Sequence, residues 1–374
     1  MPNARRKGLN RTTRPVGKEH TQETKHSLLK WVGGVTAILS LIFGIRQATL
    51  LVSESSERQR QIEELFTIGK AQQVAGDYPA AWASFEQALK SAEEGNQAPK
   101  LLGRLGKERG RLRQAQEDLA MVWLQNIRIP EGQSFSDTVD KLVLVLNRGT
   151  TNEKGARKAD LLAHVGWAYF LKSRDGTGAP NPEPHYRAAL QIDPTNPYAH
   201  VYWAHWQLWQ GGNLAEAQRH FADALASGRE REYVRNIQLA ALLNSRSEET
   251  EAEFLRVVNE MRKNKEKIED KIRNHLYSIY YFSCKWEDAR FQKLVAAVPA
   301  AEQLRLFREL FYVNNFDASK YLTRDACYAT LLEAAGRKEE ALKKWMILRE
   351  KYPDAGSSVF NRSEAAMKRL SPVR

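Results

Sequence analysis

The sequence has few of the residues that cross-link a fold covalently or hold a metal. Only two cysteines occur in 374 residues, which is too few for a disulfide framework or for a four-cysteine zinc site. Cys284 and Cys327 are therefore expected to be small apolar core residues. A disulfide between them would require an oxidising compartment and close approach of the two side chains.

Motifs for catalysis and for nucleotide binding are also missing. The sequence contains no HExxH and no GxSxG. The glycines of residues 103–110 lie in a helical pattern, and those of residues 149–158 are spaced wrongly for a phosphate-binding loop. His200 and His205 diverge around a helix, and His164 is far from both in the sequence, so these three predict no metal site. We expect a protein that is not an enzyme and holds no cofactor.

Positive charge is in excess, but it is unevenly distributed. The net charge is +12, and about half of it falls within residues 1–30. Residues 1–27 have few apolar side chains and are predicted to form a disordered basic tail. The rest of the chain is only mildly basic, so the high isoelectric point does not indicate a nucleic-acid partner.

A single apolar segment follows the tail. Residues 31–45 are 15 residues without a charge, and flanking leucines extend the run over residues 28–52, long enough for a transmembrane helix. A buried core helix and a cleaved signal peptide are the alternatives. Lysine and arginine are more numerous before the segment than after it. This bias predicts a single-pass protein of a bacterial inner membrane, with a cytoplasmic tail and a periplasmic body.

Small residues recur on one face of the predicted span. The spacing of Gly33, Ala37, Ser40 and Gly44 would let a second membrane helix approach closely. The face therefore predicts either a homodimer or docking to a membrane partner. Chance placement among lipid-facing residues is the alternative.

The body, residues 56–368, has helical periodicity and no sustained strand alternation, which predicts an all-α fold. Its first part combines small residues such as Gly69 and Ala81 with the large Phe85. This spacing suits two helices that cross closely. The pattern resembles the tetratricopeptide repeat (TPR), a helix–turn–helix unit of about 34 residues.

Four stretches carry the resemblance, about residues 62–95, 159–196, 197–230 and 322–355. The resemblance implies a TPR-like helical solenoid, or superhelix, in which each helix pair packs on the next. Between the matched stretches, periodicity predicts further helices near residues 98–128, 134–146, 234–243, 248–262, 268–282, 286–295 and 301–313.

The resemblance also implies a binding surface, because the first helix of each repeat lines an inner groove in this family. The corresponding positions are aromatic or histidine: His164, Trp167, Tyr198, Tyr202, His205 and Trp209. Rigid aromatic side chains serve as anchors for a bound peptide. Packing between adjacent helices is the alternative role.

A basic stripe is the second candidate surface. Lys100, Arg104, Lys107 and Arg111 fall on one helical face, which predicts docking to lipid headgroups or to an acidic protein. A solvated helix face is the alternative.

These observations together predict a membrane-anchored TPR scaffold. Its function would be protein–protein interaction in the assembly or maintenance of an envelope complex, with a protein or peptide partner and contact with membrane lipid. Two other functions remain open. One is an import-receptor-like protein with cytosolic repeats, and the other is a sensor or regulatory subunit of an enzyme.

Overall fold

The chain is all-α wherever the structure describes it. The computed structural model describes residues 46, 54, 56–94, 102–127, 134–176, 178–245, 247–312, 321–354 and 357–371. Helices make up most of these residues and none of them is in a strand, which confirms the all-α part of the predicted fold. The contacts divide the chain into two compact units, with the boundary between Leu119 and Ala120. The boundary falls inside the range predicted as one repeat domain.

The predicted membrane segment is not part of this description. The tail (residues 1–27) and the span (residues 28–52) lie outside the described residues, except for Arg46. The face formed by Gly33, Ala37, Ser40 and Gly44 lies outside them too. Of the helices that are described, none combines the length and the hydropathy needed to cross a bilayer.

The first unit is built from a helix over residues 56–74, α2 (Tyr78–Glu94) and the first part of α3 (Leu102–Gln125). Apolar residues of all three helices meet in its core, among them Ile62, Leu89 and Leu112. Helix α3 lies within residues 98–128, where the sequence predicts helix.

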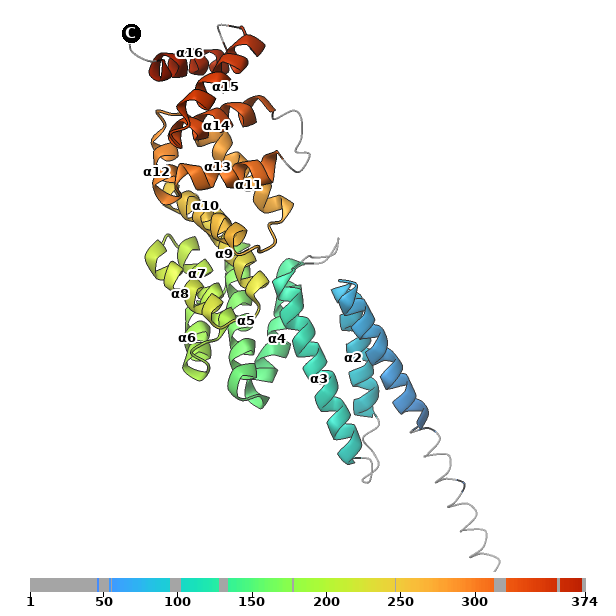
Figure 1. The fold of residues 1–374 in the computed structure, drawn as a ribbon. Coiled ribbons are helices and arrows are strands. Elements are labelled where there is room, and N and C mark those ends of the chain that lie inside the picture. Colours follow the sequence, from blue (N-terminus) through green and yellow to red (C-terminus); the bar gives the residue numbers. More distant parts are fainter. Residues whose placement is uncertain are drawn as a thin grey trace, which may run out of the picture. The chain divides into compact units, whose positions relative to one another are not determined.

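The second unit is a succession of helices in chain order (Figure 1). They are α4 (Phe135–Asn152), α5 (Gly155–Arg174), α6 (Glu183–Ile192), α7 (Pro197–Trp209), α8 (Leu214–Ala226), α9 (Arg231–Ser245), α10 (Glu248–Lys263), α11 (Asp270–Ser283), α12 (Ala289–Ala297), α13 (Ala300–Phe311), α14 (Tyr321–Ala334), α15 (Lys338–Lys351) and α16 (Ser358–Leu370). Most packing joins neighbours in the chain. In addition, α7 packs against both α5 and α9. Packing between sequential helices is consistent with a helical repeat.

Close approach within helix pairs depends on a small residue facing a large one. A Cβ atom added to Gly69 would lie 2.7 Å from the Phe85 ring, and one added to Gly166 would lie 2.5 Å from the Tyr186 ring. Both aromatic side chains are fully buried. Ala204 and Phe221 in the pair α7–α8, and Ala329 and Trp345 in the pair α14–α15, are likewise buried. A buried small residue and a buried large aromatic residue therefore occur in each of four helix pairs, and two of these pairs show the close approach directly.

Local sequence explains where α7 begins and ends. The Asn196 side chain accepts a hydrogen bond from the Ala199 N–H, and Pro197 occupies the first helical turn. After the helix, Gly211 has a φ of 74°, a conformation that glycine adopts without strain. The cap and the glycine set the length of the helix and thus of the aromatic face it carries.

The five helices predicted between residues 230 and 320 correspond to α9 to α13, with small shifts at their ends. Trp286 lies in the turn before α12 because Asp288 caps that helix, accepting a hydrogen bond from the Arg290 N–H. Helix α4 continues to Asn152, six residues beyond the predicted end at Leu146. Cys284 and Cys327 are free and buried, as expected for core residues.

Candidate functional site

Aromatic side chains gather where α5, α7 and α9 pack together. On α7, Tyr198, Tyr202, His205 and Trp209 share one face, because their spacing follows the helical repeat. Trp167 of α5 stacks on Tyr202 with ring centroids 4.5 Å apart and planes inclined by 17°. We call this group the aromatic row. It contains His164, Trp167 and Phe170 of α5, the four α7 residues, and Tyr233 of α9.

Further ring contacts make the row continuous. At one end, His164 lies 4.6 Å from Tyr198. At the other end, Phe170 lies 5.1 Å from His205 and 6.0 Å from Trp209, measured between ring centroids. Edge-on and offset pairs of this kind stabilise a core beyond the area that they bury. All six predicted groove residues therefore belong to one cluster. Phe170 and Tyr233, which the sequence analysis did not single out, belong to it as well.

Polar atoms inside the row are linked by hydrogen bonds that determine the tautomer and the charge of the His164 ring. Its Nδ1 lies 2.7 Å from the Asp160 carbonyl oxygen, which only accepts, so Nδ1 carries the proton. Its Nε2 then accepts from the Gln125 amide at 2.9 Å and from the Tyr202 hydroxyl at 3.1 Å. The Tyr202 hydroxyl in turn lies 2.8 Å from that of Tyr233. The ring of His164 is therefore neutral.

Burial strengthens the preference of both histidines in the row for the neutral form. It lowers the pKa of His164 to about 4, although the hydrogen bond to the Asp160 backbone acts in the opposite direction. Burial also lowers the pKa of His205 to about 3, and the positive charge of Arg174 lowers it further. Neither side chain is protonated near neutral pH.

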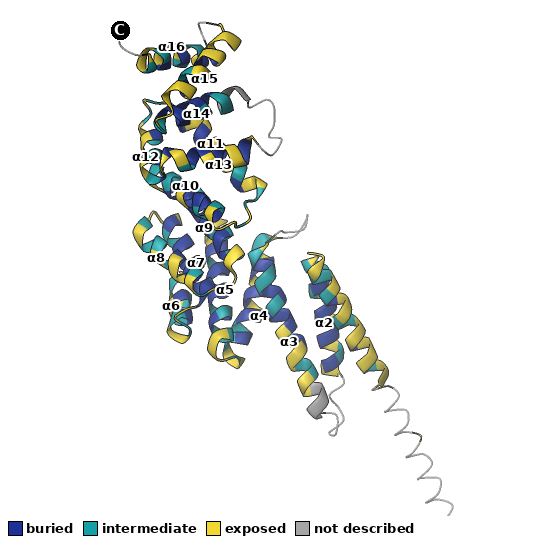
Figure 2. Ribbon diagram, viewed as in Figure 1, coloured by how far each residue is buried: buried dark blue, intermediate teal, exposed yellow. Residues whose placement is uncertain are grey.

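The six predicted groove residues differ in their access to solvent. His164, Trp167, Tyr202 and His205 are buried. Figure 2 shows the buried colour over much of α5, the helix that carries the first two. Tyr198 is half-buried, and Trp209 has 42% of its surface exposed. The four central side chains thus contact neighbouring helices, while the two end residues provide the accessible aromatic surface.

A polar cluster lies beside the Tyr198 end of the row. The Asp160 carboxylate accepts hydrogen bonds from the Asn196 amide at 2.6 Å and from the Arg229 guanidinium at 3.0 Å. Burial raises the pKa of Asp160, although Asn196 and Arg229 act in the opposite direction. The cluster ties α5 to the segments that precede α7 and α9, and it holds polar groups next to Tyr198.

The basic stripe is described only in part. Lys100 and the side chain of Arg104 lie outside the described residues, and Lys107 is exposed. Arg111 forms ion pairs with Glu63 at 2.7 Å and Glu108 at 3.2 Å, and its guanidinium lies 3.8 Å from the centroid of the Phe66 ring. Its charge is therefore shared with two carboxylates.

A small hollow lies among α9, α10, α11 and α12. Its volume is about 150 Å³, below the roughly 300–1,000 Å³ typical of small-molecule sites. Phe254, Ile279 and Phe282 form part of its apolar wall, and the ion pair between Arg290 and Glu251 lies at its edge.

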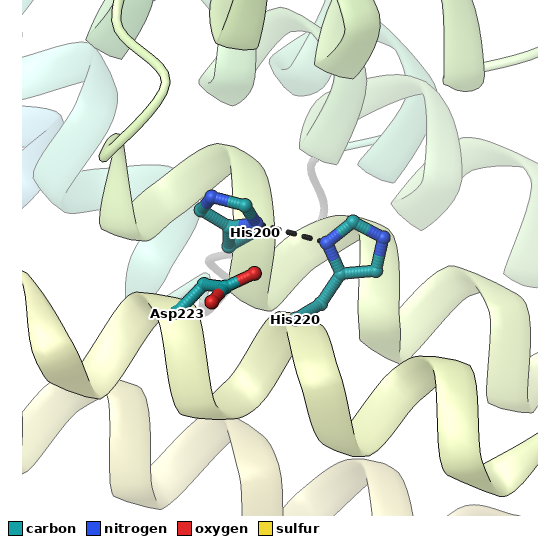
Figure 3. Close-up of side chains that lie close together, drawn as sticks. All are labelled: His200, His220 and Asp223. Atoms are coloured by element: carbon teal, nitrogen blue, oxygen red, sulfur yellow. Dashed lines mark hydrogen bonds between the residues drawn. The ribbon is translucent and has the colours of Figure 1, made fainter.

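The opposite face of α7 brings together three side chains that sequence analysis did not associate. His200 of α7 faces His220 and Asp223 of α8 (Figure 3). The available signal was the spacing of His220 and Asp223, which places both on one face of a helix. Their approach to His200 depends on how α7 and α8 pair.

Comparison with known proteins does not assign the chain to a family. No protein-family model matches the chain, and no curated protein matches it significantly.

Proposed function

We propose that the chain is a TPR-type scaffold that binds another polypeptide. The observation that carries the repeat assignment is the recurring small-to-large contact, Gly69 with Phe85 and Gly166 with Tyr186. These are the positions at which the TPR pattern requires a small and a large residue. Gly166 and Tyr186 are farther apart in the sequence than Gly69 and Phe85 are. The longer turn between α5 and α6 accounts for the difference.

The aromatic row supports the binding role. Its buried centre gives α5, α7 and α9 a rigid common surface, and rigid aromatic side chains at its edge lose little entropy when a partner binds. Along α7, Tyr198 and Trp209 are separated by about 16 Å at the rise of an α-helix. An extended peptide of about five residues spans that distance.

Trp209→Ala is expected to weaken partner binding about tenfold or more, because exposed tryptophans next to a packed surface are frequent anchors. The full-length chain is purified from its native host in mild detergent, and co-purifying proteins are quantified by mass spectrometry. Met346→Ala serves as the matched control, because Met346 is 55% exposed on α15. Partner recovery that is unchanged by Trp209→Ala contradicts a binding site at this end of the row.

The proposal includes anchoring through residues 28–52 in a bacterial inner membrane, with the body in the periplasm. The uncharged run and the excess of lysine and arginine before it support this topology. Protease added to intact spheroplasts is then expected to digest the body. A body digested only after lysis would instead favour the import-receptor-like arrangement with cytosolic repeats.

A further inference from the structure

The group formed by His200, His220 and Asp223 has the composition of a metal site. Each residue offers one ligand atom, and these three atoms all lie within 4.8 Å of one another. Figure 3 shows the two imidazole rings facing each other across the α7–α8 pair, with the carboxylate beside them. Two imidazole nitrogens and one carboxylate oxygen form a donor set that suits Zn²⁺ and related divalent ions.

The hydrogen bonds of His200 leave the correct nitrogen available. Its Nε2 lies 2.9 Å from the Pro194 carbonyl oxygen, so Nε2 carries the proton and donates it. The lone pair is therefore on Nδ1, which points toward His220. A metal-binding histidine usually donates its other ring N–H to a carbonyl or carboxylate in this way, which fixes the tautomer and the ring orientation.

The separation of the two rings is close to what a metal requires. The Nδ1 atoms of His200 and His220 are 2.9 Å apart. Two nitrogens bound tetrahedrally to zinc are separated by about 3.3 Å, from bond lengths of about 2.0–2.1 Å. A shift of a few tenths of an ångström would therefore accommodate the ion, at the cost of the hydrogen bond between the rings.

The surroundings hold His220 in place and leave the site open to solvent. Trp203 stacks on the His220 ring with centroids 4.8 Å apart. His200 is buried, His220 is intermediate and Asp223 is exposed, so an ion has a direct path from solvent. Asp223 and Glu216 place negative charge near His220, and Arg219 places positive charge there.

We propose that His200, His220 and Asp223 bind one divalent transition-metal ion of the Zn²⁺ class, with water in the remaining position. The ion would connect α7 to α8 on the face opposite the aromatic row. If no ion binds, the two histidines form only a hydrogen-bonded pair. The two alternatives differ in whether the protein has measurable affinity for Zn²⁺ at these residues.

The test is calorimetric titration of the purified full-length chain, without a histidine tag, with Zn²⁺ near neutral pH. Loss of an outer-shell partner weakens metal binding by roughly 10- to 100-fold, so loss of a ligand should cost at least as much. His220→Phe keeps a ring next to Trp203 but removes both nitrogens, and is expected to abolish the binding of one ion. Asp223→Asn changes an exposed residue and is expected to weaken binding about tenfold or more.

His275→Ala is the matched control, because it removes an exposed histidine of α11. It is expected to bind Zn²⁺ as the wild type does. Visible absorption of the Co²⁺-loaded chain gives a second readout and should lose its tetrahedral bands in His220→Phe. The proposal is overturned if the wild type and His220→Phe bind Zn²⁺ equally well, or if His275→Ala loses the ion. Circular dichroism of each variant separates a lost site from a lost fold.

Discussion

Gly166→Val is expected to destabilise the second unit by about 3 kcal/mol, because overpacking a closed core typically costs 1–3 kcal/mol and valine adds more than one carbon. The Cβ atom alone would lie 2.5 Å from the Tyr186 ring. That ring is fully buried and cannot turn into solvent. Denaturation of the purified chain by urea measures the change.

Two controls isolate the steric cause. Gly106 is a helical glycine, and an added Cβ there meets no neighbouring atom of the described residues within 4 Å. Gly106→Val should therefore cause no comparable loss, since valine is the better helix former. Tyr186→Leu removes the ring atoms that would clash. In the Gly166→Val background it should therefore cost less than it does alone. Equal stability of Gly166→Val and wild type would show that α5 and α6 do not approach this closely.

Acidification from pH 7.5 to 5 is expected to cost about 4 kcal/mol of stability through His164 and His205. Their pKa values in the folded protein are lowered to about 4 and about 3, whereas unfolded histidine titrates near 6.5. Between these values the unfolded chain binds protons that the folded chain does not, so stability falls as the pH falls below 6.5. At pH 5 the loss is about 2 kcal/mol for each histidine.

Urea denaturation at both pH values measures the total loss, to which His185 and His220 also contribute because burial lowers their pKa values. His164→Gln and His205→Gln should each remove about 2 kcal/mol of it, because glutamine does not titrate. Glu266 does not contribute to the difference in stability between pH 7.5 and pH 5. Burial alone would raise its pKa, but Arg231 and Arg235 outweigh burial and lower it. Its contribution to stability therefore persists above about pH 4.5 and is lost only at lower pH. A pH dependence unchanged in both variants would contradict neutral, buried histidines.

The sequence predicted the helices of the body well, because their periodicity and their glycine and proline positions are local signals. The stretch 159–196, matched as one helix–turn–helix unit, also places Gly166 and Tyr186 in one helix pair. The spacing of the aromatic residues of α7 places them on one face of that helix. Whether that face is open or covered depends on α5 and α9, so the burial of Trp167 and Tyr202 could not be predicted from one helix.

The contact between His200 and His220 also could not be predicted from the sequence of a single helix. The two residues lie on different helices, and their rings meet only because of the register in which α7 pairs with α8. That register depends on the turn at Gly211, where one added or missing residue would rotate His220 away from His200 by about 100°. Spacing along one helix does not contain this information.

The order of helix packing in the second unit has a consequence for how the protein is made. Each helix meets partners that are close to it in the chain, so contact order is low and loop closure costs little entropy. Helix pairs that leave the ribosome early can dock before the C-terminal helices are synthesised. In a translation reaction without membranes, a ribosome stalled after residue 297, far enough along for α9 to have left the exit tunnel, is therefore expected to carry a nascent chain in which α5, α7 and α9 already resist protease.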